Sequence, residues 1–203
     1  MEGADPLNVI VTGVGGQGNV LISQLMGSAL VRTGHHVTIG ETYGASQRGG
    51  AVMSHLRISR EAQYGPLIPH GQANVILGLE PVETLRVLGQ YGNPDVTVIT
   101  NSRPVYPLAV AIGTAQYPSV EEIVKALEEL SSKAWLINAT DIALDLGASI
   151  LTNIVMAGAL VGAGVLPLAP EEFEQELQES LPADRLDFNL KAFRRGLAEV
   201  KAR

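Results

Sequence analysis

Short apolar runs alternate along the chain with segments whose apolar residues recur at helical spacing. Residues 8–12 form a β-branched run that predicts a buried strand, and residues 18–33 predict a helix directly after it. Gly34 ends this helix, and residues 36–39 predict a second strand. The expected apolar side of the helix carries four residues: Val20, Leu21, Leu25 and Leu30. A strand, a helix and a strand in this order predict a βαβ unit with a right-handed crossover.

The same alternation predicts the middle of the chain. Further strands are expected at residues 52–58, 74–79, 95–100 and 134–138, and helices at residues 81–88 and 119–130. Within 52–58 the alternation is strict, so Leu56 and Ile58 share one face of the strand while Met53 and His55 share the other. A capping box, Ser119 with Glu122 three residues on, is expected to start the helix at 119–130.

From residue 141 onward the spacing of apolar residues becomes helical. Helices are expected at about residues 141–146, 151–162, 170–180 and 183–201. No internal repeat and no linker long enough to separate domains is present in the sequence. We therefore expect an α/β fold: a Rossmann-like, doubly wound, mostly parallel sheet in a single domain over residues 1–203, with a C-terminal helical part over about 141–203.

Two uncharged stretches are long enough to be considered as a membrane-spanning segment or a signal peptide. Residues 146–170 are long enough to cross a bilayer, but polar residues and prolines confine their continuous apolar part to 154–166. We expect a buried helix there, and the small residues 157–159 within it suit either a core or an interface. Residues 6–31 follow Glu2 and Asp5, where a signal peptide needs Lys or Arg. A cytoplasmic protein without a membrane partner is expected.

Composition narrows the function classes. Hydrophobic residues make up 46% of the 203 residues and aromatic residues only 4%, which suits an aliphatic sheet buried on both faces. The chain has no cysteine, so it offers neither a thiol nucleophile nor thiolate ligands for an iron–sulfur cluster. A net charge of −7 and a pI of about 5.1 argue against a nucleic-acid partner.

The candidate chemistry begins in a glycine loop, Gly13-Val14-Gly15-Gly16-Gln17-Gly18, which follows the first strand and opens the first helix. Its G-x-G-x-x-G spacing permits a tight turn, close approach of a ligand to the backbone, and packing of the helix on the strand. Free N–H groups at the helix start favour an anion. Glu41 then stands where dinucleotide folds carry a ribose-binding acid. A nicotinamide or flavin, another anion, another subunit or a purely structural turn all fit this pattern.

A second loop, over residues 41–50, leaves the carboxyl end of the second strand, at the edge of the sheet that also carries the glycine loop. Arg48 suits a bidentate clamp on a phosphate or carboxylate, and Gly49 and Gly50 beside it let backbone come close. Alternatively, Arg48 pairs with Glu41 and fixes the loop.

Other catalytic patterns are missing from the sequence. The four histidines have no metal-ligand spacing, so no metal site is expected. Neither the G-x-S-x-G pattern of hydrolases nor the P-loop of nucleotide triphosphatases occurs. The sequence therefore predicts no catalytic residue of its own.

The two loops together resemble a known family. The glycine loop, the second loop with Gln47-Arg48-Gly49-Gly50, and the strand that follows are similar to the gamma domain of 2-oxoacid:ferredoxin oxidoreductases, and among these to the small (beta) subunits of indolepyruvate ferredoxin oxidoreductases. The segment Gly78-Leu79-Glu80-Pro81 and the helix around 153–160 agree with this resemblance. The resemblance spans about residues 8–170. Asn19 departs from it, because an aliphatic residue is more usual there.

The resemblance implies an accessory subunit, inactive alone. Enzymes of this family decarboxylate a 2-oxoacid on thiamine diphosphate, pass electrons through 4Fe-4S clusters to ferredoxin, and release an acyl-CoA. It implies that a larger partner subunit carries the thiamine and the clusters, and that coenzyme A contacts this domain in some members. The expected ligand-binding or interface residues are those of the two loops: Gly13, Gly15, Gly16, Gln17, Gly18, Gln47, Arg48, Gly49 and Gly50.

Two other functions stay open from the residues alone. The glycine loop with Glu41 fits a stand-alone dinucleotide-binding dehydrogenase, although no catalytic His, Lys or Tyr stands in a familiar setting. The small-residue segment 157–159 fits a non-enzymatic partner-binding module that has kept the fold.

Overall fold

The computed structural model describes residues 4–43, 50–106, 110, 112–114 and 116–201. Six strands form one sheet in the order β2-β3-β1-β4-β5-β6. The strands are β1 (Leu7–Val14), β2 (His36–Tyr43), β3 (Ala51–Ser59), β4 (Val75–Gly78), β5 (Thr97–Asn101) and β6 (Lys133–Ile137). Each strand predicted from the sequence is present, within a few residues of its expected bounds.

Strand direction confirms the mostly parallel sheet and adds one exception. β1, β4, β5 and β6 pair in parallel, whereas β3 is antiparallel to both of its neighbours, β1 and β2. β1 and β2 therefore run in the same direction, as the βαβ pattern predicts, but β3 lies between them. This insertion separates the end of β2 from the end of β1 by two strand spacings, roughly 10 Å.

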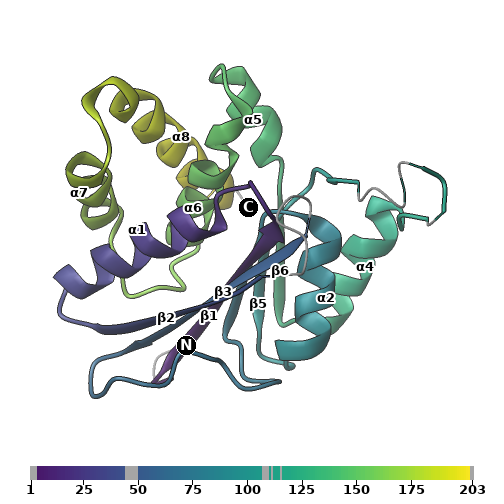
Figure 1. The fold of residues 1–203 in the computed structure, drawn as a ribbon, viewed down its shortest axis with the longest axis horizontal. Helices are drawn as coiled ribbons and strands as arrows, with labels where there is room; N and C mark the ends of the chain where they lie inside the picture. The colour runs from purple at the N-terminus through teal and green to yellow at the C-terminus, as the bar shows by residue number, and fades with distance from the viewer. Residues whose placement is uncertain (1–3, 44–49, 107–109, 111, 115, 202–203) are drawn as a thin grey trace.

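Helices cover both faces of the sheet (Figure 1). α1 (Asn19–Arg32), α6 (Thr152–Gly162), α7 (Pro170–Ser180) and α8 (Ala183–Lys201) lie on one face, with α5 (Ala139–Asp145) and the short 3-10 helix η1 (Ser149–Leu151) near its edge. α2 (Pro81–Tyr91) and α4 (Val120–Leu130) lie on the other face. The capping box of α4 is present, with the Ser119 hydroxyl oxygen accepting from Glu122 N and the Glu122 carboxylate accepting from Ser119 N.

The predicted buried side of α1 was partly wrong. Leu25 and Leu30 are buried, but Leu21 is exposed and Val20 only half-buried, while Ile22 and Met26 fill the core in their place. Until Arg32 the helix carries no charged residue, and two apolar residues, Leu21 and Val31, are exposed together with Gln24 and Ser28, so the sequence pattern does not mark the buried side clearly.

The sheet separates two apolar clusters because its side chains alternate between faces. In β1, Val9 and Val11 pack with the larger cluster under α1 and α6, and Ile10 packs with the smaller one under α2 and α4. The predicted faces of β3 are confirmed, since Leu56 belongs to the first cluster and Met53 to the second. Burial on both faces explains the nearly continuous apolar strands of the sequence.

The helices α6 and α8 cross at glycines. A Cβ on Gly158 would lie 2.1 Å from Phe193 O, and one on Gly196 would lie 1.9 Å from Val155 O. The segment 157–159 is therefore core, packed against α8, in this structure. Among the described residues, no helix combines the length and the apolar character needed to cross a bilayer.

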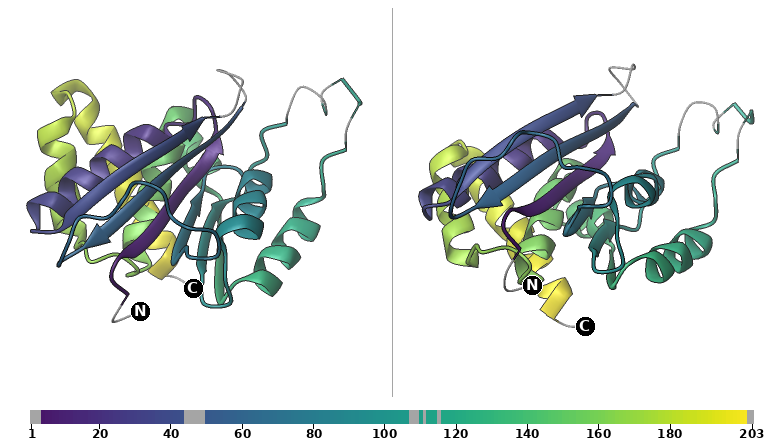
Figure 2. Two further views of the ribbon diagram at one scale, coloured as in Figure 1. Left: turned by 60° about the horizontal axis from the view of Figure 1, so that its bottom comes forward. Right: turned by 90° about the horizontal axis from the view of Figure 1, so that it is seen from below.

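The N-terminal end of the described chain lies away from the carboxyl edge of the sheet. Figures 1 and 2 show this end beside the start of β1, whereas β1 and β2 end at the opposite edge. We call this opposite edge, with the loops that leave it, the rim.

Candidate functional site

The two predicted loops meet at the rim. Gly15 N donates a 2.9 Å hydrogen bond to Gly50 O, which joins the glycine loop to the end of the second loop. The Thr12 hydroxyl and Asn19 Nδ2 both donate to Val52 O, each at 3.3 Å, and so hold the start of β3. The expectation that both loops share one edge is thus confirmed for these residues, and Asn19, the departure from the family pattern, contributes to the contact.

Part of the second loop lies outside the described residues. Gln47, Arg48 and Gly49 belong to the segment 44–49, so their proposed ligand contact and the alternative Arg48–Glu41 pair both stay predictions. Gly50 is described and half-buried. The Glu41 carboxylate accepts a hydrogen bond from the Tyr43 hydroxyl, and this bond raises the pKa of Tyr43.

The glycines of the first loop meet different demands. Gly16 and Gly18 have φ values of +99° and +89°, which L side chains rarely adopt. Gly18 is also the N-cap of α1, and a Cβ there would lie 2.3 Å from Asn153 Nδ2 of α6. At Gly13 a Cβ would lie 2.6 Å from Gln17 Oε1. These glycines thus serve the tight turn that the sequence predicts, and they also serve the helix start and close packing, in which Gly18 meets α6; the predicted close approach of a ligand stays a prediction.

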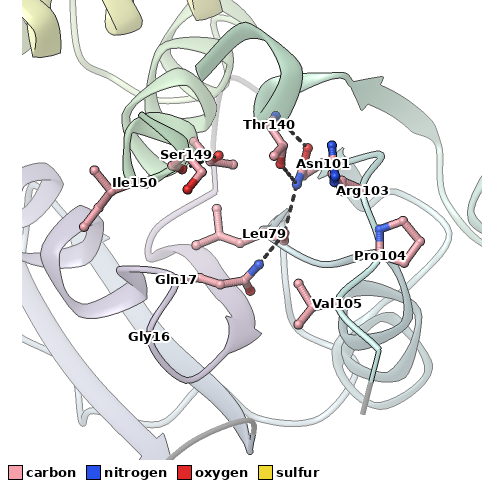
Figure 3. Close-up of a pocket in the computed structure, with 11 residues that line it drawn as sticks. Gly16, Gln17, Leu79, Asn101, Arg103, Pro104, Val105, Thr140, Ser149 and Ile150 are labelled. Atoms are coloured by element: carbon pink, nitrogen blue, oxygen red, sulfur yellow. Dashed lines mark hydrogen bonds between the residues drawn. The ribbon is translucent and has the colours of Figure 1, made fainter. Parts of the chain in front are cut away.

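Gln17 fills the inside of this loop. Its Oε1 accepts from Val14 N at 2.7 Å, and its Nε2 donates to Leu79 O at 3.1 Å (Figure 3). The side-chain amide therefore bridges the ends of β1 and β4 and uses a backbone N–H of the loop. In a dinucleotide fold the pyrophosphate packs against this turn. Here Gln17 occupies the turn, and Glu41 lies two strands away, so the geometry disfavours the dehydrogenase alternative.

A chain of side-chain amides continues across the rim. Asn101 Nδ2 donates to Leu79 O at 3.3 Å and to the Thr140 hydroxyl at 2.9 Å, and Thr140 N donates to Asn101 Oδ1 at 3.4 Å. Figure 3 shows these bonds linking Gln17, Leu79, Asn101 and Thr140. They join the ends of β1, β4 and β5 to the start of α5, which follows β6. The result is a hydrogen-bonded polar floor made of Gln17, Leu79 O, Asn101 and Thr140, here called the amide floor.

A cavity of about 370 Å³ lies over the amide floor. Arg103 supplies a cation to its lining, and Leu79, Val105 and Ile150 supply apolar surface. Arg103 Nη1 donates to Asp141 Oδ1 at 3.1 Å, and both of these side chains are 54% exposed. This volume falls in the range of small-molecule sites.

A buried carboxylate supports one wall of the cavity. Glu80, the N-cap of α2, accepts from Glu83 N at 2.8 Å and from Val105 N at 3.3 Å. It also accepts from the Tyr117 hydroxyl, and burial together with this bond raises the pKa of Tyr117 well above its usual value. Glu80 therefore holds Val105 beside the cavity, and its carboxylate is already hydrogen-bonded within the protein.

Sequence reasoning found the glycine loop but missed Asn101, Arg103 and Thr140. Each stands alone just at or after the end of a strand, so no local motif marks it. The signal that could have found them is their position at or just after predicted strands, because the carboxyl ends of parallel strands share one edge of the sheet. Among the residues that the structure describes, no group of three or more His, Cys, Asp or Glu side chains could hold a metal ion.

The sequence of this chain is similar to those of known proteins of one family. The family model described as pyruvate ferredoxin/flavodoxin oxidoreductase matches residues 8–199. The chain is 40% identical over 195 residues to the indolepyruvate oxidoreductase subunit IorB of Pyrococcus horikoshii, an alignment that covers 96% of each chain.

Solved structures agree on the fold. The pyruvate oxidoreductase subunit PORC of Thermotoga maritima is similar with a TM-score of 0.71 and 23% identity, over 97% of both chains. A 2-oxoglutarate:ferredoxin oxidoreductase from Magnetococcus marinus is similar with a TM-score of 0.76 and 22% identity, over 98% of this chain and 32% of that chain. The same fold therefore also occurs as about a third of a longer polypeptide.

Proposed function

The chain belongs to the pyruvate ferredoxin/flavodoxin oxidoreductase family, and we propose that it is the accessory subunit of an indolepyruvate-type 2-oxoacid:ferredoxin oxidoreductase. The observation that carries the proposal is the 40% identity to an indolepyruvate oxidoreductase subunit over 96% of both chains. It is supported by the rim, where the two loops typical of the resemblance meet through the Gly15–Gly50 hydrogen bond. The chain is thus a subunit of an oxidoreductase.

The cofactors of the reaction belong on a larger partner. Thiamine diphosphate and iron–sulfur clusters supply decarboxylation and electron transfer in complexes of this family. The residues of this chain do not fit a cluster, because the sequence has no cysteine. We therefore assign both cofactors, and the contact with ferredoxin, to a larger subunit in the cytoplasm.

We assign to this chain a contribution to ligand or subunit contact at the rim. The proposed residues are the two loops, from Gly13 to Gly18 and from Gln47 to Gly50. The loop backbone approaches Gly50 within hydrogen-bonding distance, and Gln17 and Asn101 tie the strand ends of the rim together through Leu79 O. A rim whose groups are already held in place can contact a ligand or a partner subunit with little ordering cost at binding.

Reconstitution tests this function. The chain and its larger partner would be purified separately and assayed, alone and mixed, for reduction of ferredoxin with indolepyruvate and coenzyme A. We expect no turnover by this chain alone and turnover by the mixture, with a higher kcat/KM for indolepyruvate than for pyruvate. A lone chain that oxidises the substrate, or a partner whose activity does not depend on the chain, would refute the proposal.

The role of the second loop needs a separate assay. Arg48→Ala is expected to lower turnover of the assembled enzyme about tenfold or more, with assembly by gel filtration unchanged, if the loop contacts a ligand. Arg86→Ala removes an exposed arginine, paired with Glu83 on α2, and serves as the control. Loss of assembly with unchanged turnover per complex would instead make the loop an interface element.

A further inference from the structure

A second cavity, here called the far cavity, lies at the edge of the sheet opposite the rim. Its volume is about 830 Å³, within the range of small-molecule sites. β1 begins at this edge with Leu7, and the antiparallel β3 ends there, with Ile58 paired to Leu7. The lining also includes residues 164–167, which follow α6. None of the described residues that line the far cavity belongs to the rim.

Part of the buried lining of the far cavity is apolar. Leu7, Ile58 and Leu166 belong to the larger apolar cluster, and each is at most 8% exposed. Val165 packs against the same cluster and is half-buried. Aliphatic side chains offer neither hydrogen bonds nor charge, so this part of the lining suits the apolar part of a ligand.

The buried polar groups of the lining already have partners. Arg60 Nε donates to His35 Nε2 at 3.2 Å, and because arginine is only a donor, His35 carries its proton on Nδ1. This Nδ1 donates to the Thr33 hydroxyl at 3.0 Å. Ser59 Oγ accepts from Glu61 N at 3.0 Å. A neutral histidine therefore positions the Arg60 guanidinium without neutralising its charge.

The exposed part of the lining carries charges of both signs. Asp5, Arg60 and Glu61 all line the cavity and are exposed. Within the described part of the chain, neither carboxylate forms an ion pair, and Arg60 bonds only to His35, through Nε. The terminal nitrogens of Arg60 are thus available, and so are two carboxylates close to the same apolar surface.

These charges restrict the ligand. An organic anion without a positive group would be attracted by Arg60 but repelled by Asp5 and Glu61, and the reverse holds for a cation. A molecule with both charges satisfies both signs. Its carboxylate matches the planar fork of Arg60, whose donors bind carboxylates bidentately, and its ammonium group matches the two acidic side chains.

We propose that the far cavity binds an α-amino acid with an apolar side chain. The carboxylate of the ligand pairs with Arg60, its ammonium group lies beside Asp5 and Glu61, and its side chain lies on Leu7 and Ile58. The proposal goes beyond the proposed function, because this cavity lies at the edge opposite the rim. An amino acid is also neither a substrate nor a product of the oxidation of a 2-oxoacid.

Calorimetry on the full chain tests the proposal with three matched probes. They are L-leucine, isocaproate, which lacks the amino group of leucine, and isoamylamine, which lacks its carboxylate. We expect L-leucine to bind at least tenfold more tightly than either analogue, because each analogue leaves one sign of charge in the cavity without a partner. Equal affinity for L-leucine and isocaproate would contradict the assigned role of Asp5 and Glu61.

Variants of the lining locate the binding. Arg60→Gln should weaken the binding of L-leucine at least tenfold, because it removes the partner of the carboxylate. The double variant Asp5→Asn/Glu61→Gln should weaken the binding of L-leucine and tighten that of isocaproate. Arg103→Gln, which changes an exposed arginine of the cavity over the amide floor, is the control and should leave the affinity for L-leucine unchanged.

Three results would overturn the proposal. L-leucine could give no saturable heat up to about 10 mM, a concentration above the Kd of any site of even millimolar affinity. Arg60→Gln could bind it as tightly as the wild type. Arg103→Gln could lose the binding, which would place L-leucine at the rim. If Arg60→Gln melts at a lower temperature than Arg103→Gln, the opposite changes expected for L-leucine and isocaproate in the double variant decide instead.

Discussion

Glycine is required at the rim and at the α6–α8 crossing for different physical reasons. At the rim, Gly16 has a φ of +99°, and nothing lies within 4 Å of the position that a Cβ would take, so its requirement is conformational. At the crossing, Gly158 and Gly196 lie within helices, and a Cβ on either would overlap a backbone carbonyl oxygen of the other helix. Gly18 combines both demands. The glycine-rich loop from Gly13 to Gly18 marks the first kind of glycine in the sequence, and no comparable motif marks the second.

The largest effect is expected at the crossing. In Gly196→Ala the new methyl would lie 1.9 Å from Val155 O, and because both partners are backbone, the two helices must move apart. We expect a loss of about 3 kcal/mol or more in the free energy of unfolding, at the upper end for overpacked cores. Urea denaturation measures it, and Gly158→Ala should behave alike. An unchanged midpoint in both variants would contradict the close approach of α6 and α8.

At the rim, the variants Gly18→Ala and Gly16→Ala separate the cost of the backbone conformation from the cost of a steric contact. Both place a side chain at positive φ, which costs about 1–2 kcal/mol. Gly18→Ala should cost more than Gly16→Ala, because only its methyl meets Asn153. Adding Asn153→Ala to each variant is the control: it should recover stability only with Gly18→Ala. Equal losses for the two single variants would remove the steric part of the argument for Gly18.

These glycine effects are measured most cleanly above neutral pH because of His55. This side chain is buried, its Nδ1 accepts from Ile68 N at 3.3 Å, and burial lowers its pKa. Below the unfolded-state pKa of about 6.5, the unfolded chain therefore binds a proton that the folded chain resists, and stability falls as the pH falls. Denaturation midpoints between pH 5 and 8 should show a shallower acid decline for His55→Asn than for the wild type. Parallel pH profiles would show that His55 contributes nothing to acid sensitivity.

The smallest effect has the opposite sign. Gly89 lies in α2, is exposed, and has nothing within 4 Å of a Cβ. Gly89→Ala should therefore stabilise the protein by about 0.4–1 kcal/mol, because alanine loses less backbone entropy in a helix. Thermal or urea denaturation checks the sign, and the variant serves as the matched control for Gly196→Ala. A destabilised Gly89→Ala would mean that α2 does not tolerate a side chain there.

Much of the fold could be predicted because local pattern and local structure agree. The capping box at Ser119, the proline start of α2 and the alternation of Leu56 and Met53 across β3 are all properties of neighbouring residues. The position of β3 between β1 and β2 could not be predicted, because alternation shows which side chains share a face but not which strand lies beside which. The prediction of the buried side of α1 failed because apolar residues of this helix occur on all its sides, exposed Leu21 and Val31 included.

The candidate site also has a part that could be predicted from the sequence and a part that could not. The glycine loop and the edge it shares with Gly50 were predictable from spacing and strand direction. Asn101, Arg103 and Thr140 were not, because they are single residues from separate strand ends that only the folded sheet brings together. Gln17 stood inside the predicted motif, yet its bridge to Leu79 depends on β4 lying next to β1, which no local pattern specifies.

The placement of the N-terminal end beside the start of β1 has a practical outcome for protein engineering. A covalent tether, a purification tag or a whole neighbouring domain attached there would emerge at the edge of the sheet opposite the cavity that Arg103 lines. Single-chain versions in which a companion precedes this polypeptide can thus be made without obstructing entry of small molecules to that cavity. The Magnetococcus marinus protein shows that a similar fold occurs within a longer chain, of which it makes up 32%.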